Sequence, residues 1–257
     1  MTKVSRLIAS LAVVAMSVAP AFGAGVITQW NFNTTVAANN APAPSIGTGA
    51  ATPVGMNNNA NGADIVAAGG SVLSSDTGTP NNAWRVRGST SNGWSGTTQL
   101  LSGARFNVST AGVEDVVVRF EVQATDGSPR HGQFQYTIDG SNFVSFGDLI
   151  DFNRSFDGWA PFVYNLSALP AVEDNPQFGF KLVSAFSPVE FTNLNGTQAA
   201  NTAFQRASAT NQVYNGTAGN WRFDMVTVSA TAVPEPAALL LLALGGLLAL
   251  RRSRCHG

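Results

Sequence analysis

Cysteine and histidine are scarce in this chain of 257 residues. The one cysteine, Cys255, lies at the C-terminal end, and His131 is the one histidine in the long central part. A single thiol cannot form a disulfide within one chain, so the central part must be stabilised by packing. Sites that need two histidines or any cysteine are excluded there too, which removes most zinc arrangements and leads us to expect no metal centre.

Charge is also sparse, at 11% of all residues. Between residues 25 and 232 there are nine basic and fourteen acidic residues, for a net charge of −5, and Lys181 is the one lysine. A mildly acidic surface without basic clusters does not attract phosphate backbones. We therefore expect no nucleic-acid partner.

The N-terminus has the pattern of a secretory signal peptide. Lys3 and Arg6 form a positive region, Leu7–Val18 is apolar, and small residues follow at Ala19–Ala24. The apolar run is too short for a transmembrane helix, which needs about 20 residues. We predict export by the Sec machinery and removal of the signal peptide, residues 1–24, with cleavage after Ala21 or up to Ala24.

The C-terminus has three consecutive parts. Val233-Pro234-Glu235-Pro236 is followed by the apolar run Ala237–Leu250, and three arginines come directly behind it, at Arg251, Arg252 and Arg254. This ending resembles the PEP-CTERM sorting signal of bacterial exported proteins. The resemblance implies a transmembrane sorting helix and an exosortase-like membrane protease that recognises the Pro-Glu-Pro box.

Together the two ends predict a topology and a location. With the N-terminus exported, the arginine cluster stays cytoplasmic and anchors the chain in the inner membrane. The domains expected are a signal peptide (1–24), an ectodomain (25–232) in the periplasm and a sorting signal (233–257). After processing, the ectodomain is expected at the cell surface or in the extracellular matrix.

The central part shows short alternating runs typical of half-buried strands. In Val118–Ala124 and Gln133–Ile138 every second residue is apolar, which places Phe134, Tyr136 and Ile138 inward and Gln133 and Gln135 outward. The turn formers Asp126–Pro129 lie between the runs and predict an antiparallel hairpin. A second turn, at Asp139–Asn142, leads into a strand around Phe143–Phe146.

Further strands are predicted from the same pattern, and the chain between them is assigned to loops. They are Val26–Phe32, Ala83–Arg87, Ala104–Val108, Phe162–Leu166, Phe178–Ser184 and Trp221–Val228. The last changes phase, which indicates a bulge or burial on both faces. Ala37–Asn61 and Asn193–Asn220 are predicted to be long loops, the second with a short helix as an option at Ala199–Arg206.

About nine or ten strands in some 200 residues predict an all-β fold, a single β-sandwich of jelly-roll type. The opening strand Ile27–Asn33, the middle segment Gln135–Ser141 and the closing strand Trp221–Val228 resemble the jelly-roll sandwiches of secreted carbohydrate-binding and surface proteins. In those proteins the first and last strands are often neighbours in one sheet.

Catalytic chemistry has few candidates. A Ser-His-Asp site would have to use His131, which we predict to be a solvated histidine in the hairpin loop. A glycosidase needs only two carboxylates at a suitable separation. The candidate carboxylates are Glu114, Asp115, Asp148, Asp151, Glu173, Asp174 and Glu190. Most flank turns, where acids form local hydrogen bonds, and we expect solvated loop residues and no enzyme.

Ligand binding has two further sets of candidates. Acidic residues crowd the loops around the central strands, and their oxygens could hold a structural Ca²⁺ ion: Asp126, Asp139, Asp148, Asp151 and Asp157. We expect no cofactor, with this Ca²⁺ ion as the alternative. Trp84, Trp94 and Trp159 lie beside Gly- and Ser-rich turns, where an indole ring can stack on a sugar or be buried under a loop. Trp30 and Trp221 are predicted core residues.

Two functions remain open. The first is an exported surface or matrix protein whose ectodomain mediates adhesion or binds extracellular polysaccharide. The alternative is a secreted polysaccharide-active hydrolase that uses the loop carboxylates.

Overall fold

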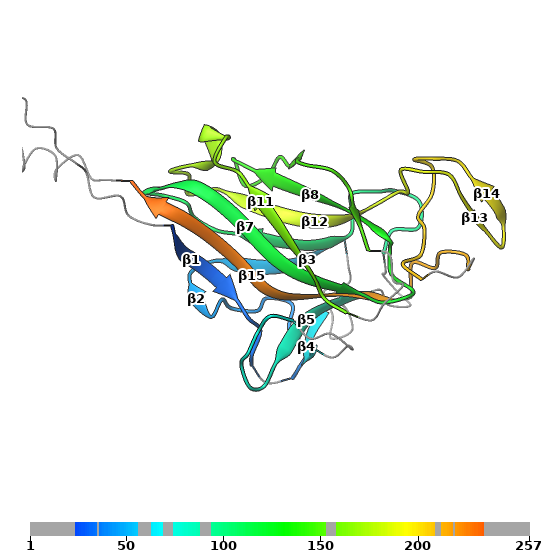
Figure 1. Ribbon diagram of the computed structural model, residues 1–257, viewed down its shortest axis with the longest axis horizontal. Coiled ribbons are helices and arrows are strands. Elements are labelled where there is room, and N and C mark those ends of the chain that lie inside the picture. Colours follow the sequence, from blue (N-terminus) through cyan, green and yellow to red (C-terminus); the bar gives the residue numbers. More distant parts are fainter. Residues whose placement is uncertain are drawn as a thin grey trace, which may run out of the picture. The chain divides into compact units, whose positions relative to one another are not determined.

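The alternating runs form the strands of two sheets that pack face to face (Figure 1). The computed structural model describes residues 24–34, 36–55, 63–68, 74–87, 94–152, 158–208, 212–217 and 219–233. Within these ranges the chain is all-β, apart from one 3₁₀ turn, η1 (Pro170–Val172). No helix in this part of the chain is long and apolar enough to cross a bilayer.

The first sheet is built around its longest strand, β15 (Asn220–Ala232), which pairs along most of its length with β7 (Val113–Ala124). The strand order is β11-β7-β15-β1-β2, and β5, which also pairs with β4, lies against the start of β15. The bounds of these other strands are β1 (Gly25–Trp30), β2 (Ile46–Gly47), β4 (Ala63–Ala67), β5 (Asn82–Arg87) and β11 (Ala160–Asn165).

The second sheet has the order β10-β8-β12-β6-β3, and β9 also pairs with β8. A separate hairpin is formed by β13 and β14. The bounds are β3 (Ala50–Val54), β6 (Gly103–Asn107), β8 (His131–Thr137), β9 (Val144–Ser145), β10 (Ile150–Asp151), β12 (Gly179–Ala185), β13 (Phe191–Asn193) and β14 (Gly196–Gln198).

Aromatic rings fill the space between the two sheets. Phe106 and Phe180 of the second sheet stack with ring centroids 5.1 Å apart, and Phe106 also meets Trp30 of the first sheet at 5.2 Å. Trp30 and Trp221 are fully buried, as predicted. Each buried Phe contributes about 1.5–3 kcal/mol, so this layer replaces the disulfides that the chain lacks.

The predicted hairpin between Val118–Ala124 and Gln133–Ile138 is wrong. Both segments are strands, but β7 pairs with β11 and β15, whereas β8 pairs with β9, β10 and β12 in the other sheet. The turn residues between them therefore carry the chain across the sandwich. Alternation shows only that each strand has an apolar face. The apolar faces of two strands can pack against each other from opposite sheets, so alternation does not show that the strands are hydrogen-bonded neighbours.

The predicted inward and outward faces of β8 are only partly correct. Phe134 is fully buried and Tyr136 half-buried, but Ile138 is 44% exposed because the chain has left the sheet by that residue. Gln133 and Gln135, predicted to face solvent, are buried and donate to the segment that contains β9. The segment Val144–Gly147, which follows β8 in the chain, therefore covers these two outward side chains.

Of the remaining predictions, those for the first and last strands are confirmed, whereas those for two predicted loop segments are not. The first and last strands are antiparallel neighbours, and β15 has a bulge at Met225, whose φ is +46°. The predicted loop Ala37–Asn61 instead contains the short edge strands β2 and β3. β2 has only two residues and β3 reads Ala-Ala-Thr-Pro-Val, so neither shows an alternation of apolar and polar residues. No helix forms at Ala199–Arg206, because Phe204 is drawn against Phe186 in a tertiary contact.

Candidate functional site

Of the two alternatives predicted for Trp84, Trp94 and Trp159, stacking on a sugar or burial under a loop, the structure shows burial for all three. Trp84 and Trp94 are 0% and 3% exposed, and their indole nitrogens donate to backbone oxygens of Asn39 and Gly219. Trp159 is 7% exposed and packs in a small cluster with Ala68 and Ala83. Their ring faces are covered by protein, so they offer no platform for a sugar in this conformation.

His131 is also placed differently from its prediction. It is the first residue of β8, is 4% exposed, and its Nε2 lies 3.4 Å from Oε1 of Gln205. Burial lowers its pKa, partly offset by the negative charge of Asp151. The residue is a neutral, buried histidine at physiological pH and not a solvated one in a turn.

The candidate carboxylates fall into separate environments. Glu173 and Asp174 accept hydrogen bonds from the backbone N–H groups of Asp115 and Gly112, and Asp151 forms a two-pronged ion pair with Arg130 at 2.7 and 2.8 Å. Glu114 is half-buried at the start of β7, while Asp148 and Glu190 are exposed. Glu114, Asp115, Glu173 and Asp174 therefore lie at the same end of the sandwich, where Glu173 and Asp174 hold turns.

The residues considered for Ca²⁺ do not converge. Asp126 is exposed, Asp151 is paired with Arg130, and Asp139 uses its carboxylate within its own turn. Asp157 lies outside the described residues. In the described ranges no three acidic, histidine or cysteine side chains gather in a way that would hold a metal ion.

Of the predicted sorting residues, Val233 is the last described and is 39% exposed. Pro234, Glu235 and Pro236 lie outside the described residues, as do the three arginines and the predicted signal peptide.

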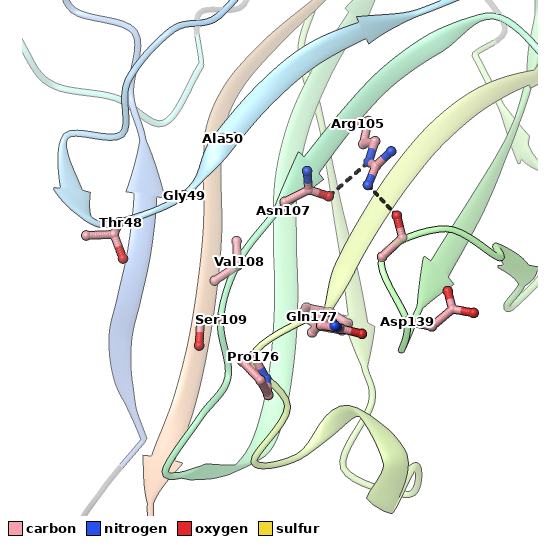
Figure 2. Close-up of a pocket in the computed structure, with 12 residues that line it drawn as sticks. Thr48, Gly49, Ala50, Arg105, Asn107, Val108, Ser109, Asp139, Pro176 and Gln177 are labelled. Atoms are coloured by element: carbon pink, nitrogen blue, oxygen red, sulfur yellow. Dashed lines mark hydrogen bonds between the residues drawn. The ribbon is translucent and has the colours of Figure 1, made fainter.

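A groove of about 480 Å³ crosses one end of the second sheet (Figure 2). It runs over the paired positions Ala50 of β3 and Asn107 of β6 and reaches Asp139 and Gly140 in the turn after β8. Its remaining wall is formed by the segments before β3, after β6 and before β12. The lining residues are Thr48, Gly49, Ala50, Arg105, Asn107, Val108, Ser109, Asp139, Gly140, Pro176, Gln177 and Phe178.

Arg105 fixes one wall of the groove. Its Nε donates to Oδ1 of Asn107 at 2.9 Å and its Nη2 donates to the carbonyl oxygen of Gly140 at 2.6 Å, as Figure 2 shows. These bonds connect β6 to the turn after β8. A Cβ atom added at Gly179 would lie 2.7 Å from the same Asn107 oxygen, so glycine is needed for this arrangement.

Asp139 fixes the turn itself. Its carboxylate accepts from the backbone N–H groups of Ser141 and Asn142 at 2.8 and 2.7 Å, and from the Asn142 amide at 2.6 Å. These bonds hold the pKa of Asp139 well below its usual range. The turn that carries Gly140 and Phe143 is therefore pre-organised, and the carboxylate is occupied.

Two cations and one aromatic ring lie beside the groove. Lys181 and Arg105 are directly paired across β12 and β6, and each lies over the ring of Phe143, at 4.3 and 5.0 Å from its centroid. Among the described residues neither cation forms an ion pair with a carboxylate. Desolvation and the neighbouring Arg105 charge lower the pKa of Lys181.

Sequence reasoning did not identify these residues, although a signal for two of them exists. Arg105 and Lys181 occupy the outward positions of predicted strands, between the inward residues Ala104 and Phe106 and between Phe180 and Leu182. Alternation therefore places each cation on an outer face. What it does not show is that β6 and β12 are neighbours in register.

A second polar cluster lies on the outer face of the first sheet, where Glu121 of β7 and Asp224 of β15 are paired and buried. Residues 74–76 cover them: Ser74 donates to Asp224 and Ser75 to Glu121. Burial raises the pKa of Asp224 to about 7, and the charges of Asp76 and Glu121 add to the effect. The pair is enclosed by protein and presents no open face to a substrate.

Comparison with known proteins finds similarity in fold only. No family model matches the sequence, and no curated protein matches it. Among solved structures, the CBM22-1 xylan-binding domain of Xyn10C from Paenibacillus barcinonensis matches with a TM-score of 0.38 and 11% identity, over 83% of this chain and 99% of that one. The C-terminal family 22 carbohydrate-binding module of Clostridium thermocellum Xyn10B matches with a TM-score of 0.37 and 11% identity, over 81% and 95%. Function has to be inferred from this chain's own residues.

Proposed function

We propose that the ectodomain is a non-catalytic glycan-binding module of an exported bacterial surface or matrix protein. The observation that carries the proposal is the groove across the end of the second sheet. Its lining combines hydroxyl, amide and guanidinium groups with apolar side chains such as those of Pro176 and Val108. A sugar chain presents the complementary surface, hydroxyl groups around the ring edges and C–H groups on the faces.

The rigidity of the groove supports this proposal. Asn107 and Arg105 are held by their mutual hydrogen bond, and the opposite turn is fixed by the Asp139 carboxylate. Groups that are already oriented lose little side-chain entropy when a ligand binds, and this favours recognition of a polar ligand. Gln177, exposed at the rim, adds a free-standing amide donor and acceptor.

The test is binding of the exported protein to a glycan array, followed by titration calorimetry on the best ligand. Gln177→Ala is expected to weaken binding about two- to tenfold, since a hydrogen bond is worth roughly 0.5–1.5 kcal/mol. Gln198→Ala, on the separate β13–β14 hairpin, removes the same side chain and serves as control. Equal affinity of both variants and the parent would place the glycan site elsewhere, and no binding on the array would reject the proposal.

We further propose that the C-terminus acts as a PEP-CTERM sorting signal, processed by an exosortase-like enzyme after Sec-dependent export. The support is in the sequence: the Pro234-Glu235-Pro236 box, the apolar run and the arginine cluster occur in this order at the end of the chain. In this proposal the protein is anchored in the inner membrane only until processing releases it to the polysaccharide layer.

Cell fractionation tests the sorting proposal. Glu235→Ala is expected to leave unprocessed protein in the inner membrane, while deletion of residues 251–254 is expected to impair retention or orientation. Glu190→Ala, an exposed acid of the ectodomain, is the control and should be processed normally. Normal surface release of both altered proteins would overturn the assignment. N-terminal sequencing of the released protein should show a start between Phe22 and Gly25.

A further inference from the structure

We infer that the glycan bound by this groove is anionic, a polysaccharide containing uronic acid, and that Arg105 and Lys181 bind its carboxylate. The inference rests on the proposed glycan-binding function and specifies the class of ligand for the same site. Three observations lead to it: the pairing of the two cations, the lack of an acidic partner for them among the residues that the structure describes, and the position of Phe143.

The two cations are held together at a cost. Lys181 and Arg105 occupy directly paired positions of β12 and β6 on the outer face of the sheet, where like charges repel each other. Partial burial lowers the pKa of Lys181, and the charge of Arg105 lowers it further. A ligand carboxylate placed between the two side chains would remove the repulsion.

No acidic side chain in the described ranges neutralises the pair. Arg85, Arg119 and Arg130 each form an ion pair with an aspartate or glutamate, whereas Arg105 uses only the amide oxygen of Asn107 and the carbonyl of Gly140. Asp139 is near enough to line the same groove, but its carboxylate already accepts four hydrogen bonds within its turn. In a protein with a net negative ectodomain, this site keeps its positive charge available.

Phe143 positions the cations. Both charged groups lie over its ring, at 4.3 Å for Lys181 and 5.0 Å for Arg105 from the centroid, within the range of cation–π attraction. The ring holds the long Lys181 side chain in place without using its hydrogen-bond donors. Among the described residues, neither the ammonium group of Lys181 nor Nη1 of Arg105 has a hydrogen-bond partner, so both groups are free to bind a carboxylate.

The alternatives are less well matched. A nucleic acid would meet a net acidic surface. In the part of the chain that the structure describes, Arg105 and Lys181 are two adjacent cations without an ion pair, too few for the many phosphate contacts that such binding needs. A small inorganic anion would use the two cations but not the adjoining groove of about 480 Å³. A polymer that carries carboxylates on sugar rings would use both.

The experiment compares two polymers with the same backbone, polygalacturonate and its carboxyl-reduced derivative, using the full exported protein and titration calorimetry. We expect polygalacturonate to bind at least tenfold more tightly, with an affinity that falls as NaCl is raised from 50 to 500 mM, because salt screens exposed charges. Lys181→Gln should reduce affinity for polygalacturonate about five- to tenfold and leave affinity for the reduced polymer unchanged. Lys181→Arg should retain most of the binding.

The control is Arg206→Gln, which changes the net charge equally but lies outside the groove lining. Its binding should equal that of the parent protein. If the parent binds both polymers equally and Lys181→Gln has no effect, the inference is wrong although the glycan-binding proposal stands. If dextran sulfate binds more tightly than polygalacturonate, the carboxylate assignment is wrong. If neither polymer nor any neutral glycan binds, the proposed function fails as well.

Discussion

Phe120 of β7 and Phe134 of β8 stack with ring centroids 6.3 Å apart and an interplanar angle of 17°, although their strands belong to different sheets. The contact therefore joins the two layers of the sandwich. Phe134 also stacks on Tyr164 of the first sheet at 3.9 Å and contacts Phe180 of its own sheet at 5.8 Å. This ring is a central point of the core, and its loss would affect both sheets.

Phe134→Ala should greatly reduce stability. Truncating a fully buried Phe costs about 3–5 kcal/mol, a large part of the roughly 5–15 kcal/mol that stabilises a typical domain. Gln135→Ala is the neighbouring control, because it loses only a hydrogen bond to Ser145 worth about 1 kcal/mol. Urea unfolding followed by circular dichroism measures both. Equal losses would show that the register of β8 is wrong.

Trp84→Ala should lower the melting temperature strongly without a specific loss of glycan affinity. The ring is fully buried against Phe32 and Phe106, at 5.9 Å from each, so its truncation removes core packing at a cost of about 3–5 kcal/mol. Calorimetric titration of the remaining folded protein should give the parent's dissociation constant. A stable variant that has lost glycan binding would restore the stacking role for this tryptophan.

Asp224→Asn should flatten the dependence of stability on pH. Because burial raises the pKa of Asp224 to about 7 from 3.8, the folded protein keeps a proton that the unfolded chain has lost between these values. The free energy of unfolding therefore falls as pH rises through this range. Asparagine cannot ionise, so the variant should lose less stability than the parent between pH 4 and pH 7.

Thermal unfolding at several pH values in this range measures the effect, with the exposed Glu190→Gln as control. Buried His131 contributes the opposite slope, since its lowered pKa adds stability as pH rises, but it does so in all three proteins and cancels in the comparison. Identical slopes for Asp224→Asn and the parent would contradict the buried, protonated state.

Gly103→Ala should disrupt the pairing of β6 with β12. A Cβ atom at this position would lie 1.9 Å from the carbonyl oxygen of Leu182, and backbone cannot move aside as a flexible side chain can. The strands would have to separate, at a cost of several kcal/mol, on the order of the larger core substitutions. Gly25→Ala is the control, since nothing lies within 4 Å of its added Cβ. Similar melting temperatures for both variants would show that β6 and β12 are not in this register.

The sequence by itself determined the fold class and the position of most strands. In Val118–Ala124 and Phe178–Ser184 side-chain alternation is a local property of the extended backbone, so it can be seen without knowing any partner strand. The same holds for the phase change in β15, where Met225 forms the bulge. That no disulfide can form within one chain likewise follows from its single cysteine.

Only the tertiary structure decided which faces meet. Phe120 and Phe134 each lie on the apolar side of an alternating run, but whether β7 and β8 pair in one sheet or pack across the core depends on competing strands distant in sequence. Burial of Trp84, Trp94 and Trp159 and exposure of Ile138 depend on loops that alternation does not place. The cluster beside the groove arises in the same way. Arg105, Phe143 and Lys181 are each 38 residues from the next in sequence, and only the register of β6 and β12 and the turn after β8 bring their charges and ring together.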